Sequence, residues 1–269
     1  MSNIDYAGKA RALRREIVTI LHRAGGSFGG GSLSCADLIT VLFHRFMRFD
    51  PARPDAPDRD MFLLSKGHCS SALYAGLASV GMIPHEALEQ YGADGSTMCI
   101  HPKKGACPGI DISSGSLGHG LALGTGSALA ARIMGYDSRV FVLLGDGECN
   151  EGSVWENAAF ASRQKLNQLI IIVDRNHLQG CGRDEDILNY GDLAGKFRAF
   201  GFNAVTIDGH DYSQIEAALE YGVAYQDGPT AIIAETVKGK GVSFMEDRLE
   251  WHYKSLNDEQ YAQAIGELT

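Results

Sequence analysis

Two uninterrupted apolar runs constrain the fold of this chain more than any other feature. RVFVLL occupies residues 139–144 and LIIIVD occupies residues 169–174, and the segment 154–165 between them has helical spacing. Strands that are apolar throughout belong to parallel sheets covered on both faces, because half-exposed strands alternate apolar and polar residues. The same alternation continues downstream, where strand, helix and strand are predicted at 204–207, 212–225 and 230–236. The sequence therefore predicts a doubly wound α/β fold, with a mostly parallel sheet and helices on both faces.

Helical spacing also runs through the first half of the chain. The periodicity predicts helices over residues 6–22, 35–47, 70–80 and 118–134. The last of these is rich in Gly and Ala, a composition typical of a tightly packed, buried helix. The Pro- and Asp-rich stretch 51–60 predicts a surface loop. No repeat, low-complexity tract or change of composition marks a boundary, so we expect residues 1–269 to form a single domain.

The charge balance and the cysteines narrow the class of protein. The 269 residues carry 24 Lys and Arg against 33 Asp and Glu, a net charge of −9. Without a basic excess, the chain is expected to bind neither nucleic acid nor membrane, although local donors or a metal can still hold a small phosphorylated ligand. No apolar run approaches the roughly 18 residues of a membrane span, and the first 15 residues lack the apolar core of a secretory signal. The six cysteines form no C-x-x-C pair, so we expect reduced thiols in a cytoplasmic protein, with a zinc site or disulfide framework as the alternative.

Polar residues follow the two central strands at the points where those strands end. GDGECNEG follows the first strand at 145–152, and Asn176 follows the second. Because the carboxyl ends of parallel strands share one edge of the sheet, Asp146 and Asn176 should converge there. Carboxylate and amide oxygens are hard ligands suited to Mg²⁺ or Ca²⁺, and Mg²⁺ usually completes its coordination with phosphate oxygens. Each residue alone is also a common loop former, but together they predict a diphosphate bridged by Mg²⁺.

The segment from Gly145 to Asn176 matches the thiamine diphosphate motif, in which GDG is followed about thirty residues later by Asn. Further blocks narrow the family, namely LSKGHCS at 64–70, SGSLGHGL at 114–121, TVKGKGVSFME at 236–246 and WH at 251–252. In order, they resemble the blocks of the amino-terminal half of transketolase. The resemblance covers nearly the whole chain. It implies an enzyme that moves a two-carbon ketol unit from a ketose phosphate to an aldose by means of thiamine diphosphate.

The resemblance also implies roles for individual residues. Mg²⁺, for which Ca²⁺ or Mn²⁺ can substitute, would be held by Asp146, Asn176 and the carbonyl of Leu178. The cofactor would be contacted by His68, Gly115, Ser116, Leu117, Gly147, Asn176 and His252. The residues implied in catalysis are His101, which would face the thiazolium and the donor hydroxyls, together with His252, Glu151 and Glu156. The two glutamates fall where the family buries carboxylates between paired subunits. Tyr74, Tyr91 and Trp155 are expected to be core or interface aromatics.

Two positions depart from the family pattern. Most transketolases have a G-H-x-G-G-S block whose His touches the substrate, and Phe28 stands at that position here. His119 stands where a Gln is usual. An apolar ring cannot replace a hydrogen bond, so a donor that needs that bond should be penalised. We therefore expect a sugar other than the common pentose phosphates.

Transketolase catalysis also needs a second domain, whose glutamate bonds the pyrimidine of the cofactor. The chain ends at Thr269, directly after the diphosphate-binding part, so that glutamate is expected on a separate pyrimidine-binding chain. We expect an α₂β₂ assembly in which this chain provides the amino-terminal half, inactive when alone.

Other functions remain open from the sequence. The nearest is the α chain of a 2-oxo-acid dehydrogenase first component, which shares the GDG and Asn motif; SKGH, TVKGKG and WH favour transketolase over it. A non-catalytic thiamine diphosphate-binding subunit is the alternative from another class. A nucleotide-binding dehydrogenase would need G-x-G-x-x-G directly after a strand, and the glycine cluster at 115–126 follows no predicted strand.

Overall fold

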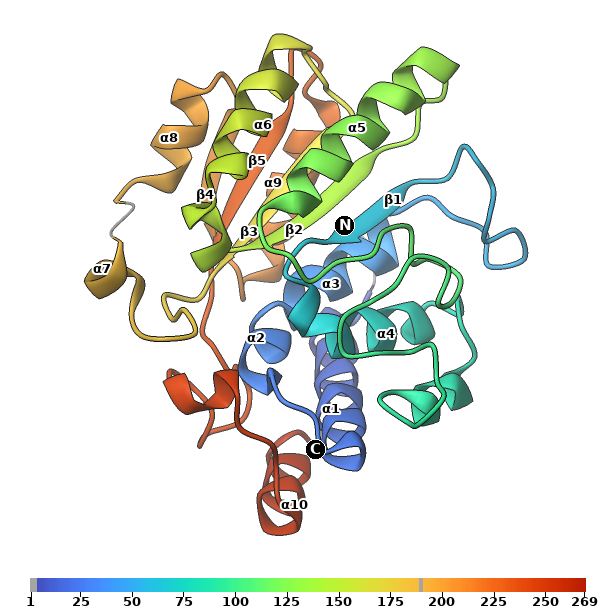
Figure 1. The fold of residues 1–269 in the computed structure, drawn as a ribbon, viewed down its shortest axis with the longest axis vertical. Helices are drawn as coiled ribbons and strands as arrows, with labels where there is room; N and C mark the ends of the chain where they lie inside the picture. The colour runs from blue at the N-terminus through green and yellow to red at the C-terminus, as the bar shows by residue number, and fades with distance from the viewer. Residues whose placement is uncertain (1–3, 189–190) are drawn as a thin grey trace.

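A five-stranded parallel sheet lies at the centre of the protein (Figure 1). The structure is a computed structural model that describes residues 4–188 and 191–269. The strand order is β1–β2–β3–β5–β4. The bounds are Met61–Leu64 for β1, Val140–Gly145 for β2, Leu169–Arg175 for β3, Asn203–Asp208 for β4 and Thr230–Glu235 for β5. The four predicted strands are confirmed to within one residue at each end. The predicted doubly wound α/β fold is confirmed as well.

Helices cover both faces of the sheet (Figure 1). Successive strand residues point to opposite faces, so Phe141 packs into one core and Val142 into the other. The core on the Phe141 face is shared with α1 (Tyr6–Ala24), α3 (Ala36–Val41), α4 (Ser70–Ser79) and α9 (Tyr212–Ala224). The core on the Val142 face is shared with α5 (His119–Met134), α6 (Gly152–Arg163) and α8 (Leu193–Ala199). Burial on both sides explains why the central strands are apolar throughout.

The helix predictions hold with two corrections. The segment predicted as one helix over 35–47 is α3 followed by a π-helical turn at Leu42–Phe46, a change of winding that apolar spacing does not reveal. The prediction that the helix over 118–134 is buried was wrong. In α5 the side chains of Leu123, Ile133 and Met134 are 43%, 76% and 61% exposed. Its small residues serve only the face that packs against the sheet, where a Cβ on Gly124 would lie 2.4 Å from Val142.

Some elements were not predicted. They are β1, α2 (Gly29–Ser34), α7 (Asp184–Ile187), α8 and α10 (Asp258–Glu267), together with short 3-10 turns at 67–69, 85–90, 147–150 and 249–252. The sequence of α2, GGGSLS, has low helix propensity. Its glycines are needed for packing, since a Cβ on Gly31 would lie 2.8 Å from the sulfur of Cys69. Tertiary contact therefore overrides local propensity in α2.

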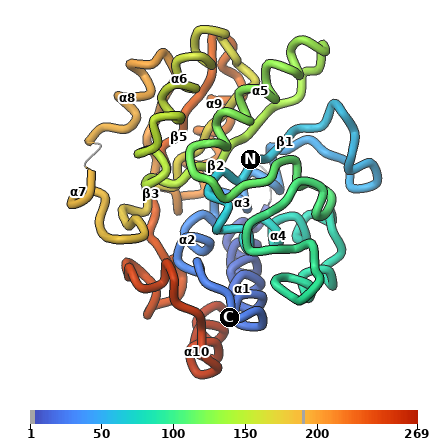
Figure 2. The backbone as a smooth tube through the Cα atoms, viewed as in Figure 1, coloured from blue at the N-terminus to red at the C-terminus, as the bar shows by residue number. Residues whose placement is uncertain are grey.

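The carboxyl-terminal helix lies against the first helix of the chain. The last helix, α10, packs beside α1, as the tube in Figure 2 shows, and Arg11 donates a hydrogen bond to the carbonyl of Thr269 at 3.1 Å. Tyr74 and Tyr91 are buried and packed together, as core aromatics. All six cysteines are free thiols. Within the described part of the chain, no helix is both long and apolar enough to cross a membrane.

Candidate active site

A cavity of about 500 Å³ opens at the carboxyl ends of β2 and β3. Ligands of doubly wound sheets bind at this edge, where the loops diverge. Ten of the predicted site residues line the cavity: His68, His101, Gly115, Leu117, Asp146, Gly147, Glu151, Asn176, Leu178 and His252. Residues far apart in the sequence therefore meet at one place.

Asp146 is a buried carboxylate directly after β2. Its Oδ1 accepts a hydrogen bond from the N–H of Gly147 and its Oδ2 accepts one from the N–H of His177, both at 2.7 Å. Burial, followed by the nearby charge of Asp174, raises the pKa of Asp146. An acidic group in this position gains from a cation that would offset its buried charge.

The segment after β3 brings two further oxygen ligands to the same place. The Asn176 amide oxygen accepts a hydrogen bond from the N–H of Leu178 at 3.2 Å. The Leu178 carbonyl accepts one from the ammonium of Lys238 at 2.8 Å. A carbonyl oxygen has two lone pairs, so this bond leaves one for a metal ion. The predicted ligands Asp146, Asn176 and Leu178 thus all line one wall of the cavity.

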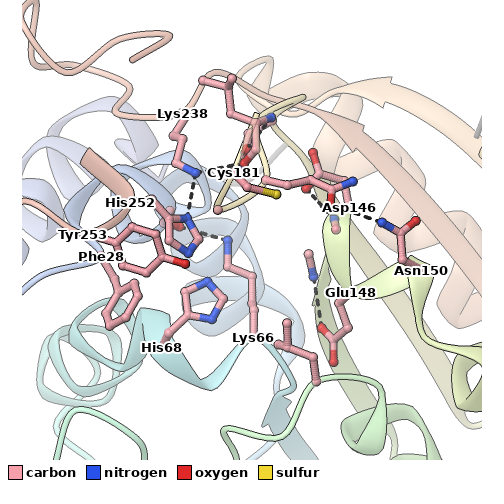
Figure 3. A pocket seen from close by; sticks show the side chains of 18 of the residues that line it. Phe28, Lys66, His68, Asp146, Glu148, Asn150, Cys181, Lys238, His252 and Tyr253 are labelled. Carbon is pink, nitrogen blue, oxygen red and sulfur yellow. Dashed lines mark hydrogen bonds between the residues drawn. The ribbon is translucent and has the colours of Figure 1, made fainter. Parts of the chain in front are cut away.

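The rings of Phe28, His68 and His252 lie together on the side of the cavity away from Asp146 (Figure 3), and His101 also lines the cavity. The ring centroid of Phe28 lies 5.2 Å from that of His68, 6.2 Å from that of His101 and 5.4 Å from that of His252. Burial, followed by the charge of Lys66, lowers the pKa of His68 to about 4. Burial, followed by Lys238, lowers the pKa of His252 to about 3. Both rings are therefore neutral at pH 7, each with one donor and one acceptor nitrogen. In His252 the acceptor is Nδ1, which faces the ammonium of Lys238, so Nε2–H is left as a donor.

Two buried lysines at the cavity were not predicted from the sequence. Lys66 forms an ion pair with Asp174, and the ammonium of Lys238 contacts Nδ1 of His252 at 2.9 Å as well as Leu178 (Figure 3). Burial lowers the pKa of Lys238 to about 8. Both lysines belong to the SKGH and VKGKG blocks, so the sequence did carry a signal for them. The pair brings positive charge to a chain that is acidic overall.

Other polar residues of the cavity were missed as well. Glu148 is buried and accepts hydrogen bonds from Ser65 and from the N–H of Gly118, the latter at 2.8 Å. It thereby joins the loop before α5 to the loop after β2. Asn150 donates to Gln179 at 3.1 Å. These contacts join residues between 29 and 83 positions apart, and no local pattern predicts them.

Three positions singled out in the sequence lie outside the cavity wall. Ser116 and Glu156 are exposed and are absent from the lining residues. His119 is also exposed, and its Nδ1 lies 3.2 Å from the carbonyl of Leu117. Its difference from the family pattern therefore does not alter the cavity surface of this chain. Glu151 does line the cavity, with an exposed side chain, and the expected burial of Glu151 and Glu156 between subunits stays a prediction.

The cavity suits a metal-bound diphosphate. Two buried polar atoms on its wall lack a partner within the described residues, namely Oδ1 of Asn150 and Nε2 of Gln179. A free amide donor in the same cavity as two lysines fits phosphate oxygens. No three His, Cys, Asp or Glu side chains of the described ranges gather as a metal site. A cation would therefore depend on Asp146 together with amide and carbonyl oxygens, a donor set of the kind that Mg²⁺ prefers.

Comparison with known proteins settles the family. Residues 6–268 match the model of the thiamine diphosphate-binding domain of transketolase. The chain belongs to the transketolase family. The predicted resemblance is thereby confirmed, over almost the whole length of the described structure.

Among curated transketolase-family proteins, the most similar include subunits of about the same length. One is a subunit of the apulose-4-phosphate transketolase of Phocaeicola vulgatus, 37% identical over 256 residues, with 95% of this chain and 91% of that one covered. Another is a 6-deoxy-6-sulfo-D-fructose transketolase subunit of a Clostridium species, 37% identical over 265 residues, with 98% and 96% covered. Human transketolase is 38% identical over 262 residues, covering 96% of this chain but 41% of its own length.

Solved transketolase structures confirm the fold. The transketolase of Leishmania mexicana superposes with a TM-score of 0.92 at 27% identity, covering 98% of this chain and 41% of that one. This chain therefore spans less than half the length of such transketolases.

Proposed function

We propose that this chain is the amino-terminal, thiamine diphosphate-binding subunit of a two-chain transketolase that transfers a two-carbon ketol unit from a ketose phosphate or related sugar to an aldose. The main support for this proposal is that Asp146, Asn176 and Leu178 line the same cavity as the neutral histidines His68 and His252. Bound thiamine diphosphate would supply the electron sink for cleavage of the carbon–carbon bond. This chain would supply binding, orientation and exclusion of water.

Each wall has its own task in the proposed reaction. Asp146, Asn176 and the Leu178 carbonyl would hold Mg²⁺, while Lys238 and His68 would contact the diphosphate. The N–H of Gly147 donates to Asp146 in this structure, so its proposed contact with the diphosphate would be shared with that bond. His101 would hydrogen-bond the hydroxyls of the donor sugar and hold it in one orientation. Nδ1 of His252 accepts from Lys238, so its Nε2–H would donate to the diphosphate or to the donor sugar. Phe28 would exclude water from the same space.

A second chain is part of the proposal. Three similar proteins of about the same length are named as subunits, and a partner carrying the pyrimidine-binding domain would supply the catalytic glutamate. Exposed apolar side chains support a docking surface, with Leu123 and Met134 on α5 and Phe160 on α6. The helix α6 begins directly beside Glu151 at the cavity, so such a partner would close the site. We propose an α₂β₂ assembly, with Glu151 and Glu156 at the contacts between subunits, in the cytoplasm, where the six free thiols would persist.

The donor sugar is proposed to differ from the common pentose phosphates. The names of two relatives specify apulose 4-phosphate and a sulfonated deoxyfructose, which supports a range of donor sugars among subunits of this type. In this chain Phe28 places an apolar ring among the histidines. That ring supports a donor that does not need a hydrogen bond at this point of the site.

The test is to isolate the native complex under mild conditions and to determine its mass and chain composition. A second chain in one-to-one ratio, with ketol transfer from at least one donor in a panel, is the expected result. Detectable transfer by the highly purified single chain would contradict the proposed dependence on a partner. A homodimer without activity would favour a non-catalytic cofactor binder, and decarboxylation of a 2-oxo acid would place the complex with the dehydrogenases.

A further inference from the structure

A fully buried carboxylate lies behind the proposed metal site. Asp174 ends the apolar run of β3, two residues before Asn176, and is 0% exposed. Its oxygens accept hydrogen bonds from four side chains: Ser34 at 2.6 Å, Asn176 at 3.3 Å, and Lys66 and Thr236. These donors come from the end of α2 and from segments that follow β1, β3 and β5. The carboxylate therefore joins four parts of the fold beneath the cavity.

Asp174 is surrounded by hydrogen-bond donors. The ammonium of Lys66 forms an ion pair with its carboxylate, and the hydroxyls of Ser34 and Thr236 both donate to it. The ammonium of Lys66 also donates to the carbonyl of Gly31 at 2.9 Å. A carboxylate paired with an ammonium only accepts hydrogen bonds, so every neighbouring polar group must present a donor to it.

This requirement decides which way the amide of Asn176 points. An amide carries donors on nitrogen and acceptors on oxygen, and the two ends have nearly the same shape. The nitrogen of Asn176 faces Asp174 at 3.3 Å and the hydroxyl of Ser34 at 3.4 Å. The oxygen consequently faces the other way, where it takes the N–H of Leu178.

We propose that Asp174 is a positioning residue that fixes the amide of Asn176 with its oxygen toward the cation. The inference rests on the proposed function, because it assumes a metal held by Asp146 and Asn176. An amide at position 174 would accept or donate equally well, so the side chain of Asn176 could reverse and present nitrogen to the metal. Nitrogen of an amide donates hydrogen bonds and does not ligate Mg²⁺.

The test measures metal binding by the full chain in the assembly in which it purifies. Binding of Mn²⁺ is followed by the loss of its free EPR signal, with thiamine diphosphate at saturation. Asp174→Asn should weaken the affinity for Mn²⁺ about 10- to 100-fold, the usual effect of removing a partner of a metal ligand. Thr236→Val removes another hydrogen bond from Asp174 without touching Asn176, and should change the affinity by less than about threefold on the same reasoning.

A swapped pair separates positioning from structural support. In Asp174→Asn combined with Asn176→Asp, the residue at 176 presents oxygen whichever way it turns, and the amide at 174 can donate to it. This double variant should recover the affinity for Mn²⁺ to within about threefold of the wild type. If Asp174→Asn weakened Mn²⁺ binding only because Lys66 lost its buried partner, the second substitution would not restore the affinity.

Circular dichroism checks that each variant is folded. A double variant that combines Lys66→Met with Asp174→Asn leaves no unpaired buried charge. Unchanged Mn²⁺ affinity in this folded variant and in Asp174→Asn would overturn the inference. A folded swapped pair that stays as weak as Asp174→Asn would overturn it too. A wild-type protein that binds no Mn²⁺ would instead remove the metal site of the proposed function, and the inference with it.

Discussion

The ring of Phe28 lies edge-on to the imidazole of His252, with centroids 5.4 Å apart and ring planes at 87°. The N–H of Phe28 also donates to the carbonyl of His252 at 3.1 Å. Phe28 adopts a left-handed backbone conformation with φ of 68°, which costs a residue with a side chain about 1 kcal/mol or more. A strained phenylalanine that lines the cavity points to a role in the site rather than in folding.

We expect Phe28→His to change the donor preference of the assembled enzyme. The variant restores a hydrogen-bonding group, and one such bond is worth about 1 kcal/mol, or about a fivefold change in rate. The kcat/KM for xylulose 5-phosphate should rise by about that factor relative to hydroxypyruvate, whose leaving group carries no hydroxyl. Phe28→Leu, which stays apolar, is the control and should leave the ratio unchanged. An equal ratio in wild type and Phe28→His would refute the role of Phe28 in selectivity.

Removing the carboxylate of Asp146 should abolish Mg²⁺-dependent binding of thiamine diphosphate. Asp146 is the only carboxylate in the proposed ligand set, so Asp146→Ala leaves the cation with amide and carbonyl oxygens. Isothermal titration with and without Mg²⁺ measures the effect. Glu151→Gln is the matched control, because Glu151 lines the same cavity with an exposed side chain. Retained affinity in Asp146→Ala would show that the metal is held elsewhere.

The buried histidines should make the cofactor-free protein sensitive to mild acid. The pKa of His68 falls from 6.5 to about 4 through burial and the charge of Lys66. The unfolded chain therefore takes up a proton near pH 6.5, whereas the folded chain resists until about pH 4. The contribution of His68 to the free energy of unfolding is complete above pH 6.5 and is lost as the pH falls from 6.5 toward 4.

His68→Gln should remove this part of the pH dependence. Between pH 7 and pH 5 the wild type should lose about 1–2 kcal/mol more free energy of unfolding than the variant. Urea unfolding at both pH values measures the difference. Parallel loss in the two proteins would mean that other groups govern acid sensitivity.

A buried ion pair should contribute strongly to stability. Arg14 on α1 contacts Asp37 on α3 through two hydrogen bonds, at 2.9 and 2.6 Å, and His210 and Tyr212 also contact that carboxylate. Arg14→Leu leaves the carboxylate buried without its cation and should lower the free energy of unfolding by about 3–5 kcal/mol.

An exposed pair provides the comparison for Arg14. Arg53 contacts Asp50 at 3.1 Å with both side chains largely exposed, and Arg53→Leu should cost less than about 1 kcal/mol. Urea unfolding of both variants tests the contrast. Similar losses in free energy of unfolding would show that burial does not determine how much these ion pairs stabilise the protein.

Local patterns were enough for four of the five strands and for the convergence of Asp146 and Asn176. The runs at 139–144 and 169–174 are strands in the structure, because uninterrupted apolar residues suit only a strand covered on both faces. Asp146 and Asn176 then meet at one edge, since parallel neighbouring strands place their carboxyl ends together. Both conclusions depend on residues close in sequence to the strands themselves.

The sequence by itself determined the α/β fold, four of the strands and the meeting of Asp146 with Asn176. Only the tertiary structure decided the strand order, the helical winding of GGGSLS in α2, the exposed face of α5 and the positions of Lys66 and Lys238 at the cavity. Lys66 reaches Asp174 across 108 positions of the chain, and Lys238 reaches Leu178 across 60. Contacts of this kind depend on how finished elements pack, whereas periodicity and turn residues report only on a segment and its immediate neighbours.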